Sequence, residues 1–176
     1  MKRIIKKWFW AWQLEKEKEF LEEQSLDGYR LVQVELGRYT FEKMDPQKLI
    51  YQMDFRGFGG KVTEEEYLQI YEDAGWKLVS KTNGWYYFYQ ENKEEIDLTI
   101  FNDNDSKSKV YKRLIGFLLL TGFPLYYNMI FILPRLEHLN YFFLIIVIMT
   151  VITILHLMAI LKLLKMYKTL RSHIQE

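Results

Sequence analysis

Hydrophobic residues in the N-terminal part of the chain recur with two different periods. In "EKEFLEEQSLDG", residues 17–28, and in "EEEYLQIYEDAG", residues 64–75, they lie three or four positions apart, which predicts a helix in each segment. Acidic residues at the start of each segment offset the helix dipole, and each segment ends at a glycine suited to a left-handed cap. Thr63 is a suitable N-cap for the second helix.

After each of these glycines the period changes to two, which predicts strands. Residues 38–42 alternate polar and aromatic side chains, and "LIYQMDF", residues 49–55, alternates again. "IDLTIF", residues 96–101, repeats that alternation and predicts a closing strand. The N-terminal "IIKKWFWAW", residues 4–12, occupies the place of a leading strand.

One unit is written twice, at a spacing of 47 residues. "GYRLVQVELGRYTF", residues 28–41, aligns without a gap on "GWKLVSKTNGWYYF", residues 75–88. The sequence therefore predicts an α+β fold, in which duplicated β-α-β-β units form an antiparallel-rich sheet with two helices on one face. A ferredoxin-like split βαβ topology remains an alternative.

The two copies differ on one face of a predicted strand. The first copy is polar there, whereas the second carries three large side chains that we call the aromatic face: Trp85, Tyr87 and Tyr89. Contiguous apolar patches that face water usually mark interaction sites. Two interpretations stay open. Either the leading strand, the linker or a second copy of the protein covers the aromatic face, or the face lines a groove for a ligand or a protein partner.

Two long apolar segments follow this domain. Leu114–Leu133 has twenty residues and Asn140–Leu161 has twenty-two, and neither contains Asp, Glu, Lys or Arg. A helix of about 20 apolar residues spans a bilayer. We therefore expect a domain over residues 1–105 and a juxtamembrane segment with a transmembrane hairpin over 106–161. A basic tail over 162–176 completes the chain.

The charges are segregated along the chain. Residues 1–105 hold 15 Lys and Arg against 21 Asp and Glu, whereas residues 106–176 hold 9 against 2. An acidic domain argues against nucleic-acid binding. Basic residues flank the two spans on the side of the termini: Lys107, Lys109, Lys112, Arg113, Lys162, Lys165, Lys168 and Arg171. Such flanks face the cytoplasm, so we expect a multi-pass protein of the cell membrane with both termini inside.

Catalytic chemistry is not evident in the sequence. Residues 1–105 contain no His and no Cys, which excludes the common nucleophile–His pairs and most zinc sites. The glutamates at 15, 17 and 19 and at 64–66 lie at helix starts, where their effect on the dipole explains them. We therefore predict no enzymatic activity, no metal and no cofactor.

Three polar residues in the predicted spans form a candidate polar face in the membrane: Thr121, Thr153 and His156. Thr153 and His156 lie three apart on one helix, and antiparallel spans bring Thr121 to a similar depth. Ionisable residues within spans are functional candidates, although a hydrogen bond to the neighbouring helix also explains His156.

Three stretches together resemble an uncharacterised bacterial family, domain-of-unknown-function family 2812, over about residues 8–113. They are "YTFEKMDPQKLIYQMDF", "YLQIYEDAGWKLV" with a following "WYYF", and "IFNDNDSKSKVYKR". The resemblance implies a small protein of Gram-positive bacteria whose domain precedes membrane spans. Members are often encoded beside a PadR-like transcription regulator, which implies a regulatory or envelope-response role. The resemblance supplies no catalytic residues.

These observations lead to two functional hypotheses. The first is a non-enzymatic, membrane-tethered regulatory or sensory module that binds a protein partner, such as a transcription regulator or a membrane protein, or an apolar ligand through the aromatic face. The alternative is an accessory subunit of a membrane complex, such as an exporter, that acts through its hairpin. Self-association is compatible with both.

The charge pattern yields a test of topology. Single cysteines introduced at Ser106 and Ser172 should be shielded from an impermeant thiol reagent in intact cells, while one at His138 should be labelled. The parent chain has no cysteine, so background labelling is absent. Labelling at Ser106 in intact cells would overturn the cytoplasmic assignment of the domain.

Overall fold

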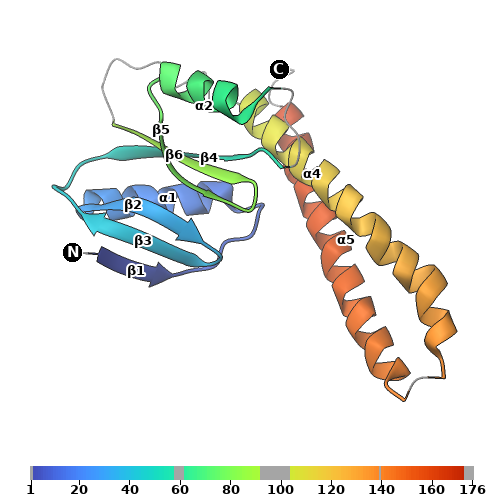
Figure 1. Cartoon of the computed structure of the whole chain (residues 1–176). Coiled ribbons are helices and arrows are strands. Elements are labelled where there is room, and N and C mark those ends of the chain that lie inside the picture. The colour runs from blue at the N-terminus through green and yellow to red at the C-terminus, as the bar shows by residue number, and fades with distance from the viewer. Residues whose placement is uncertain (1, 58–61, 92–103, 139, 173–176) are drawn as a thin grey trace. The chain divides into compact units, whose positions relative to one another are not determined.

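The computed structural model describes residues 2–57, 62–91, 104–138 and 140–172, with the side chains of 104–106 left out. The chain divides into two compact units, Met1–Ser106, which we call the head, and Lys107–Glu176, which we call the hairpin. The head contains β1 (Lys2–Lys6), α1 (Leu14–Leu26), β2 (Tyr29–Glu35), β3 (Arg38–Lys43), β4 (Leu49–Phe55), α2 (Glu64–Asp73), β5 (Lys77–Thr82) and β6 (Trp85–Glu91) (Figure 1). The predicted closing strand at 96–101 lies outside the described residues.

The strands form two antiparallel sheets of three strands each. The first sheet has the order β1-β3-β2 and the second the order β4-β6-β5. The predicted α+β class with antiparallel pairing is confirmed, but the strands divide between two sheets. The leading strand ends at Lys6, so the aromatic residues that follow it belong to a loop.

Positions 47 residues apart are equivalent in the two sheets. Val34 pairs with Tyr39 between β2 and β3, and Lys81 pairs with Tyr86 between β5 and β6. Each of these strand pairs also has one irregularity, between Leu31 and Gln33 in the first sheet and between Leu78 and Ser80 in the second. The two sheets therefore share strand order, and the β2–β3 and β5–β6 pairs share their register and the position of a bulge.

We call β1, α1, β2 and β3 the first half of the head, and β4, α2, β5 and β6 the second half. In each half the helix covers the equivalent face of the sheet. Phe20 of α1 contacts the rings of Tyr39 and Phe41, with centroids 5.5 and 6.1 Å away. In the second half, Tyr71 of α2 stacks on Phe88 at 4.0 Å, within a buried cluster of Ile50, Tyr67, Tyr71, Trp76, Tyr86 and Phe88. Thr63 caps α2 through a reciprocal capping box with Glu66, as predicted for that helix start.

The remaining face of the second sheet is covered by the first half of the head. The backbone N–H of Leu49 in β4 donates to Ser25 Oγ of α1 over 3.1 Å. The edges of β2 and β5 meet, and there the Val34 amide of β2 donates to Ser80 Oγ of β5 over 3.0 Å. A second β2 amide, that of Leu31, donates to the hydroxyl of Tyr51 in β4 over 3.2 Å. Both faces of the second sheet are therefore packed, which explains why β6 carries aromatic residues on both faces.

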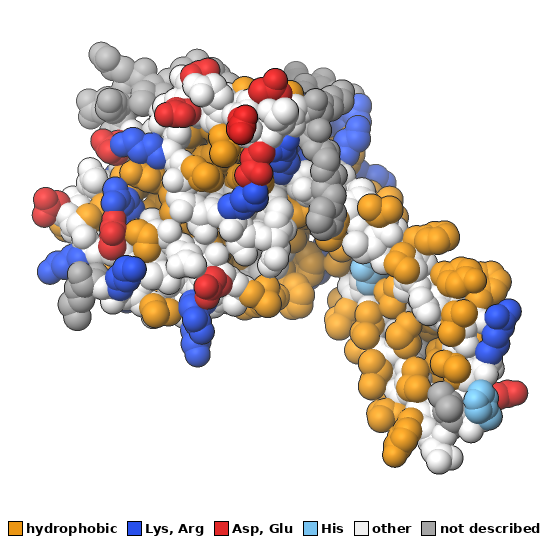
Figure 2. All heavy atoms as spheres, viewed as in Figure 1, with side chains coloured by type: hydrophobic (Ala, Val, Ile, Leu, Met, Phe, Trp, Pro, Cys, Tyr) orange, Lys and Arg blue, Asp and Glu red, His pale blue; other side chains and the backbone are white. Residues whose placement is uncertain are grey.

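The hairpin consists of α4 (Asn104–Tyr127), a π-helical turn (Asn128–Ile132), a 3₁₀ turn (Leu133–Leu136) and α5 (Phe142–Ser172). Lys107–Leu136 and Phe142–Ser172 are long and apolar enough to cross a membrane, and both exceed the predicted spans. Figure 2 shows hydrophobic side chains over most of the visible hairpin surface, whereas both signs of charge are mixed on the head. Pro124 lies within α4, and the Asn128 side chain donates to its carbonyl oxygen over 2.7 Å.

The glycines that end α1 and α2 give a test of the fold. Gly28 and Gly75 have φ of +83° and +82°, and an added Cβ would lie 3.0 Å from the Met44 carbonyl oxygen or 2.8 Å from Gln90 Nε2. Gly28→Val or Gly75→Val should each lower the unfolding free energy of the full chain in detergent by about 1 kcal/mol or more. Asn83, at φ 47°, supplies the control, because Asn83→Gly should leave stability nearly unchanged. Two neutral valine variants would contradict the capping assignment.

Candidate functional site

The aromatic face is divided between two places in the structure. Trp85 and Tyr87 line a cavity of about 210 Å³ in the head. Tyr89 lies outside this cavity and is only 8% exposed, and its hydroxyl accepts a hydrogen bond from Arg30 Nη1 over 3.2 Å. Residues of the first half of the head supply these contacts, and they include Trp8, Phe9 and Trp10 of the segment predicted as the leading strand, which line the cavity together with Trp85 and Tyr87.

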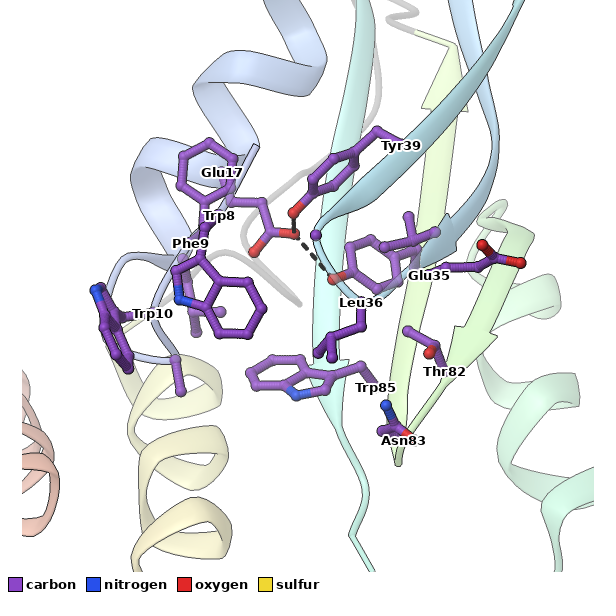
Figure 3. A pocket seen from close by; sticks show the side chains of 15 residues that line it. Trp8, Phe9, Trp10, Glu17, Glu35, Leu36, Tyr39, Thr82, Asn83 and Trp85 are labelled. Carbon is purple, nitrogen blue, oxygen red and sulfur yellow. Dashed lines mark hydrogen bonds between the residues drawn. The ribbon is translucent and has the colours of Figure 1, made fainter. Parts of the chain in front are cut away.

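The cavity, which we call the Glu17 pocket, lies where the loop after β1, the turn after β2 and the start of β6 come together (Figure 3). Aromatic and aliphatic side chains make up most of its wall, and Glu17 is its buried carboxylate. The lining residues are Trp8, Phe9, Trp10, Ala11, Leu14, Glu17, Val34, Glu35, Leu36, Gly37, Tyr39, Thr82, Asn83, Trp85 and Tyr87.

The loop between β1 and α1 places tryptophans at the mouth of the pocket. It is held at one end by the Lys7 amide, which donates to the Gly37 carbonyl oxygen over 3.0 Å. At the other end the Gln13 amide donates to the Trp10 carbonyl oxygen over 2.7 Å, and the Gln13 side chain accepts from the Trp10 amide. Trp8 and Trp10 remain 54% and 49% exposed, with their rings edge to face at 5.9 Å. Two large aromatic surfaces are therefore held in place yet accessible to a ligand.

Glu17 connects the helix to both sheets. Its Oε1 accepts hydrogen bonds from the hydroxyl of Tyr39 in β3, over 2.6 Å, and from that of Tyr87 in β6, over 2.9 Å. The side chain is only 6% exposed, and Figure 3 shows its second oxygen directed away from both tyrosines. One carboxylate oxygen of Glu17 thus accepts both hydrogen bonds, and the other oxygen takes part in neither.

Burial controls the ionisation of this cluster. Removal from water raises the pKa of Glu17 above its ordinary value of 4.5, and the two tyrosine hydroxyls oppose that shift only in part. Burial, followed by the charge of Glu17, raises the pKa of both Tyr39 and Tyr87 well above the usual range. Both tyrosines therefore remain protonated donors.

The second carboxylate of the lining differs from the first. Glu35 is half exposed, and its Oε2 lies 3.4 Å from Arg38 Nη1. Among the described residues, Glu17 takes part in no ion pair, and no lining residue is Lys, Arg or His. Glu17 is therefore the side chain that gives the pocket its uncompensated negative charge when it ionises.

Sequence reasoning missed Glu17 and the loop tryptophans. The carboxylate was explained as a partner of the helix dipole, yet Leu14, Glu17, Leu21 and Gln24 follow the three- and four-residue spacing of the buried stripe of α1. A carboxylate on the buried stripe of a helix is unusual, and this position was the signal in the sequence that could have identified Glu17 as a site residue. Trp8 and Trp10 were assigned to the leading strand, although the strand ends before them.

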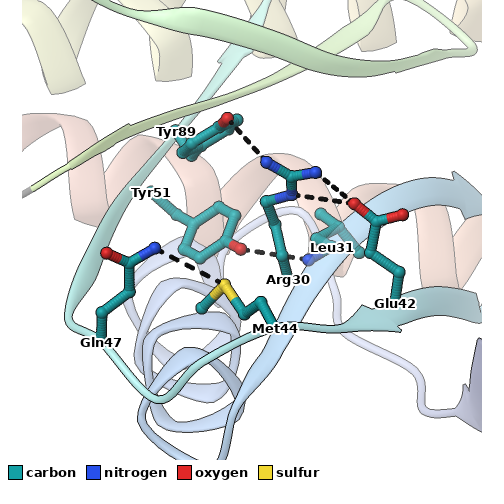
Figure 4. Close-up of polar contacts among 7 residues, drawn as sticks. All are labelled: Arg30, Leu31, Glu42, Met44, Gln47, Tyr51 and Tyr89. Atoms are coloured by element: carbon teal, nitrogen blue, oxygen red, sulfur yellow. Dashed lines mark hydrogen bonds and ion pairs between the residues drawn. The ribbon is translucent and has the colours of Figure 1, made fainter. Parts of the chain in front are cut away.

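A second polar cluster joins the two halves away from the pocket (Figure 4). Arg30 of β2 pairs with Glu42 on β3 through Nε and Nη2, and it reaches Tyr89 on β6. The hydrogen bond that Arg30 donates to Glu42 is the main reason that the pKa of Arg30 is raised. Burial raises the pKa of the neighbouring Tyr51 to about 12. These contacts hold the hydroxyls of Tyr51 and Tyr89 in hydrogen bonds within the head, and they place Tyr89 apart from the Trp85 and Tyr87 side chains of the Glu17 pocket.

The candidate polar residues of the hairpin make separate contacts. Thr121 donates to backbone carbonyl oxygens of its own helix, and Thr153 donates to the Met149 carbonyl oxygen over 2.8 Å. His156 Nδ1 and the Tyr126 hydroxyl share a hydrogen bond of 2.7 Å, beside Gly122. His156 Nε2 is buried and has no hydrogen-bond partner among the described residues. The structure brings His156 to Tyr126 rather than to Thr121.

A family model matches residues 13–123, and its description reads "Protein of unknown function (DUF2812)". No curated protein and no solved structure gives a significant match to the chain. Within the described ranges, no group of three or more His, Cys, Asp or Glu residues could hold a metal ion.

The Glu17 cluster predicts a specific dependence of stability on pH. The folded-state pKa is raised, so the stability due to this group is fully present below pH 4.5 and is lost as the pH rises through the folded-state value. Glu17→Gln keeps an oxygen that accepts from both tyrosines and removes the titration. Its stability relative to the parent should therefore increase from pH 4.5 to neutral pH, measured by thermal unfolding in detergent.

Glu17→Leu is the matched control, because it leaves the hydroxyls of Tyr39 and Tyr87 without their acceptor. It should lower the unfolding free energy by about 1–3 kcal/mol. Equal stability of the Gln and Leu variants at every pH would contradict the role assigned to the two hydrogen bonds.

Proposed function

Since the chain belongs to the DUF2812 family, we propose its function from the geometry of the head: a non-enzymatic, membrane-tethered sensory or regulatory module that binds a small ligand in the Glu17 pocket. Trp85 and Tyr87 of the aromatic face contribute to binding, and Tyr89 supports the fold. Ligand binding is read out by a protein partner in the membrane or at its inner surface.

The observation that carries this proposal is the buried carboxylate in an aromatic pocket. An ionisable group with a perturbed pKa, in a largely apolar cavity with a few convergent polar groups, is typical of a binding site. Burying Glu17 is unfavourable unless its polar atoms are used. Two hydroxyl donors hold Oε1, which leaves the remaining capacity of the carboxylate for a ligand.

The position of the pocket supports a sensory role. Its wall combines residues of the first half, such as Val34 and Tyr39, with Trp85 and Tyr87 of the second half. The halves also meet through hydrogen bonds from β2 amides to side chains of β5 and β4. A ligand that favours one spacing of the two halves therefore shifts the population toward that spacing, which a partner can detect.

The chemistry of the lining favours binding over catalysis. The pocket has no His, Cys or Ser among its described lining residues, and the raised pKa values of Tyr39 and Tyr87 keep both hydroxyls protonated, so neither is available as a general base. The two apolar helices supply the tether, with the head and the basic tail in the cytoplasm. The acidic head makes a nucleic-acid partner unfavourable.

One observation supports the alternative function, an accessory subunit that acts through its hairpin. The buried Nε2 of His156 has a hydrogen bond to give or accept, and a helix of another membrane protein or a second copy of the chain would satisfy it. In that case His156→Phe should dissociate the complex in mild detergent, whereas changes in the pocket should not.

The proposed function is tested by ligand-dependent stabilisation of the full chain in detergent. All five tryptophans lie between residues 8 and 85, so tryptophan fluorescence reports on the head alone. In a panel of small cationic, neutral and anionic compounds, one class should raise the Tm. Trp85→Ala should weaken the binding of that class by at least about tenfold, because an aromatic wall of the pocket is lost.

Leu78→Ala is the control, because Leu78 is an exposed apolar residue of the same sheet that does not line the Glu17 pocket. Its affinity should match that of the parent. A panel without any stabilising compound, or stabilisation that survives in Trp85→Ala, would refute ligand binding at this site.

A further inference from the structure

The two halves of the head treat equivalent carboxylates differently. Glu17 and Glu64 lie 47 positions apart, as do their neighbours Tyr39 and Tyr86. The strand registers confirm that Val34, opposite Tyr39, is equivalent to Lys81, opposite Tyr86. The first two pairs of equivalent positions keep the same residue type, whereas the apolar Val34 of the first half is replaced by the charged Lys81 in the second half.

In the second half, the ammonium group of Lys81 lies beside the carboxylate and the tyrosine ring. Lys81 Nζ lies 2.5 Å from Glu64 Oε1 and 5.4 Å from the centroid of the Tyr86 ring. It thus combines a carboxylate with an aromatic face, the two groups that favour a cation. The hydrogen bond from Lys81 is the main reason that the pKa of Glu64 is lowered.

In the first half, Val34 supplies no charge and instead forms part of the pocket wall. Glu17 is far more buried than Glu64, yet it makes no ion pair among the described residues. Lys7 follows β1, and its ammonium lies 5.1 Å from the centroid of the Phe9 ring and 4.2 Å from that of the Phe20 ring. Among the described residues, it forms no ion pair with Glu17. Glu17 and Tyr39 therefore have no cation from the described residues beside them, because the Lys7 ammonium lies over Phe9 and Phe20 and makes no ion pair with the carboxylate.

We propose that the Glu17 pocket binds an organic ammonium group, which takes beside Glu17 and Tyr39 the role that the Lys81 ammonium takes beside Glu64 and Tyr86. This inference rests on the proposed function and names the chemical class of its ligand. Trp8, Trp10 and Trp85 present further aromatic surface to the cation and to its alkyl substituents.

The size of the pocket limits the ligand. A volume of about 210 Å³ equals about seven water molecules, so the pocket holds a substituted ammonium group and not a large amphiphile. The apolar wall favours alkylated ammonium over a strongly hydrated primary amine, because less hydration is lost on binding.

Choline and its uncharged carbon isostere, in which a tert-butyl group replaces the trimethylammonium group, form the first test. Binding to the full chain in detergent is measured by tryptophan fluorescence and calorimetry. Choline should bind at least about tenfold more tightly than the isostere, and Glu17→Gln should abolish that preference. Glu64→Gln, which changes the equivalent carboxylate outside the pocket, should retain it.

Val34→Lys is the second test, because it gives the first half the residue of the second. The new ammonium should reach Glu17 and eliminate choline binding, while Val34→Met, an uncharged side chain of similar length, should bind choline within about threefold of the parent. Thermal unfolding of each variant establishes that it is folded before its binding is interpreted.

The outcomes separate this inference from the proposed function. Equal binding of choline and the isostere, with both lost in Trp85→Ala, would overturn the ammonium assignment and leave the ligand pocket intact. Choline preference that persists in Glu17→Gln would overturn the role of the carboxylate. Binding of neither probe, together with an unresponsive panel of compounds, would overturn both proposals.

Discussion

Two hydrogen bonds to one oxygen of Glu17 determine how the head is assembled. They attach α1 to the first sheet through Tyr39 and to the second through Tyr87. The carboxylate is removed from water. Loss of either hydrogen bond would therefore leave the carboxylate or a tyrosine hydroxyl without a partner in the interior. The helix, the two sheets and the pocket beside them therefore meet at a single side chain, to which Ser25, Tyr51 and Ser80 add further contacts between the halves.

The docking of the first half of the head on the second sheet explains why the two halves differ in residue composition although their backbones are equivalent. The second half carries its helix on one face and receives the first half on the other, so β6 needs large apolar residues on both faces. β3 receives only α1, and its opposite face keeps the polar residues Arg38, Thr40 and Glu42. Residue composition follows the number of covered faces rather than the strand geometry, which is shared.

Local patterns in the sequence were sufficient to predict the helices and strands, but they were insufficient to predict how the strands assemble into sheets. The spacing of apolar residues, the glycines and the Thr63 cap identified both helices and the strands that follow them, because these signals act over a few residues. Whether six strands form one sheet or two depends on pairing between distant edges, which periodicity does not encode. Trp85 and Tyr87 were found because they interrupt the repeat. Glu17 was missed because its acidic type at a helix start has a local explanation that hides its position on the buried stripe.

The contacts of β2 with β4 and β5 have a consequence for how such a protein can change through evolution. The amides of Leu31 and Val34 are satisfied by the hydroxyls of Tyr51 and Ser80, so side chains join the halves at these points. A backbone ladder can be altered only by shifting a whole strand, whereas a hydroxyl is added or removed by one substitution. Descendants of this chain can therefore adjust how one half docks on the other, and with it the shape of the cavity between them, while each sheet keeps its own pairing unchanged.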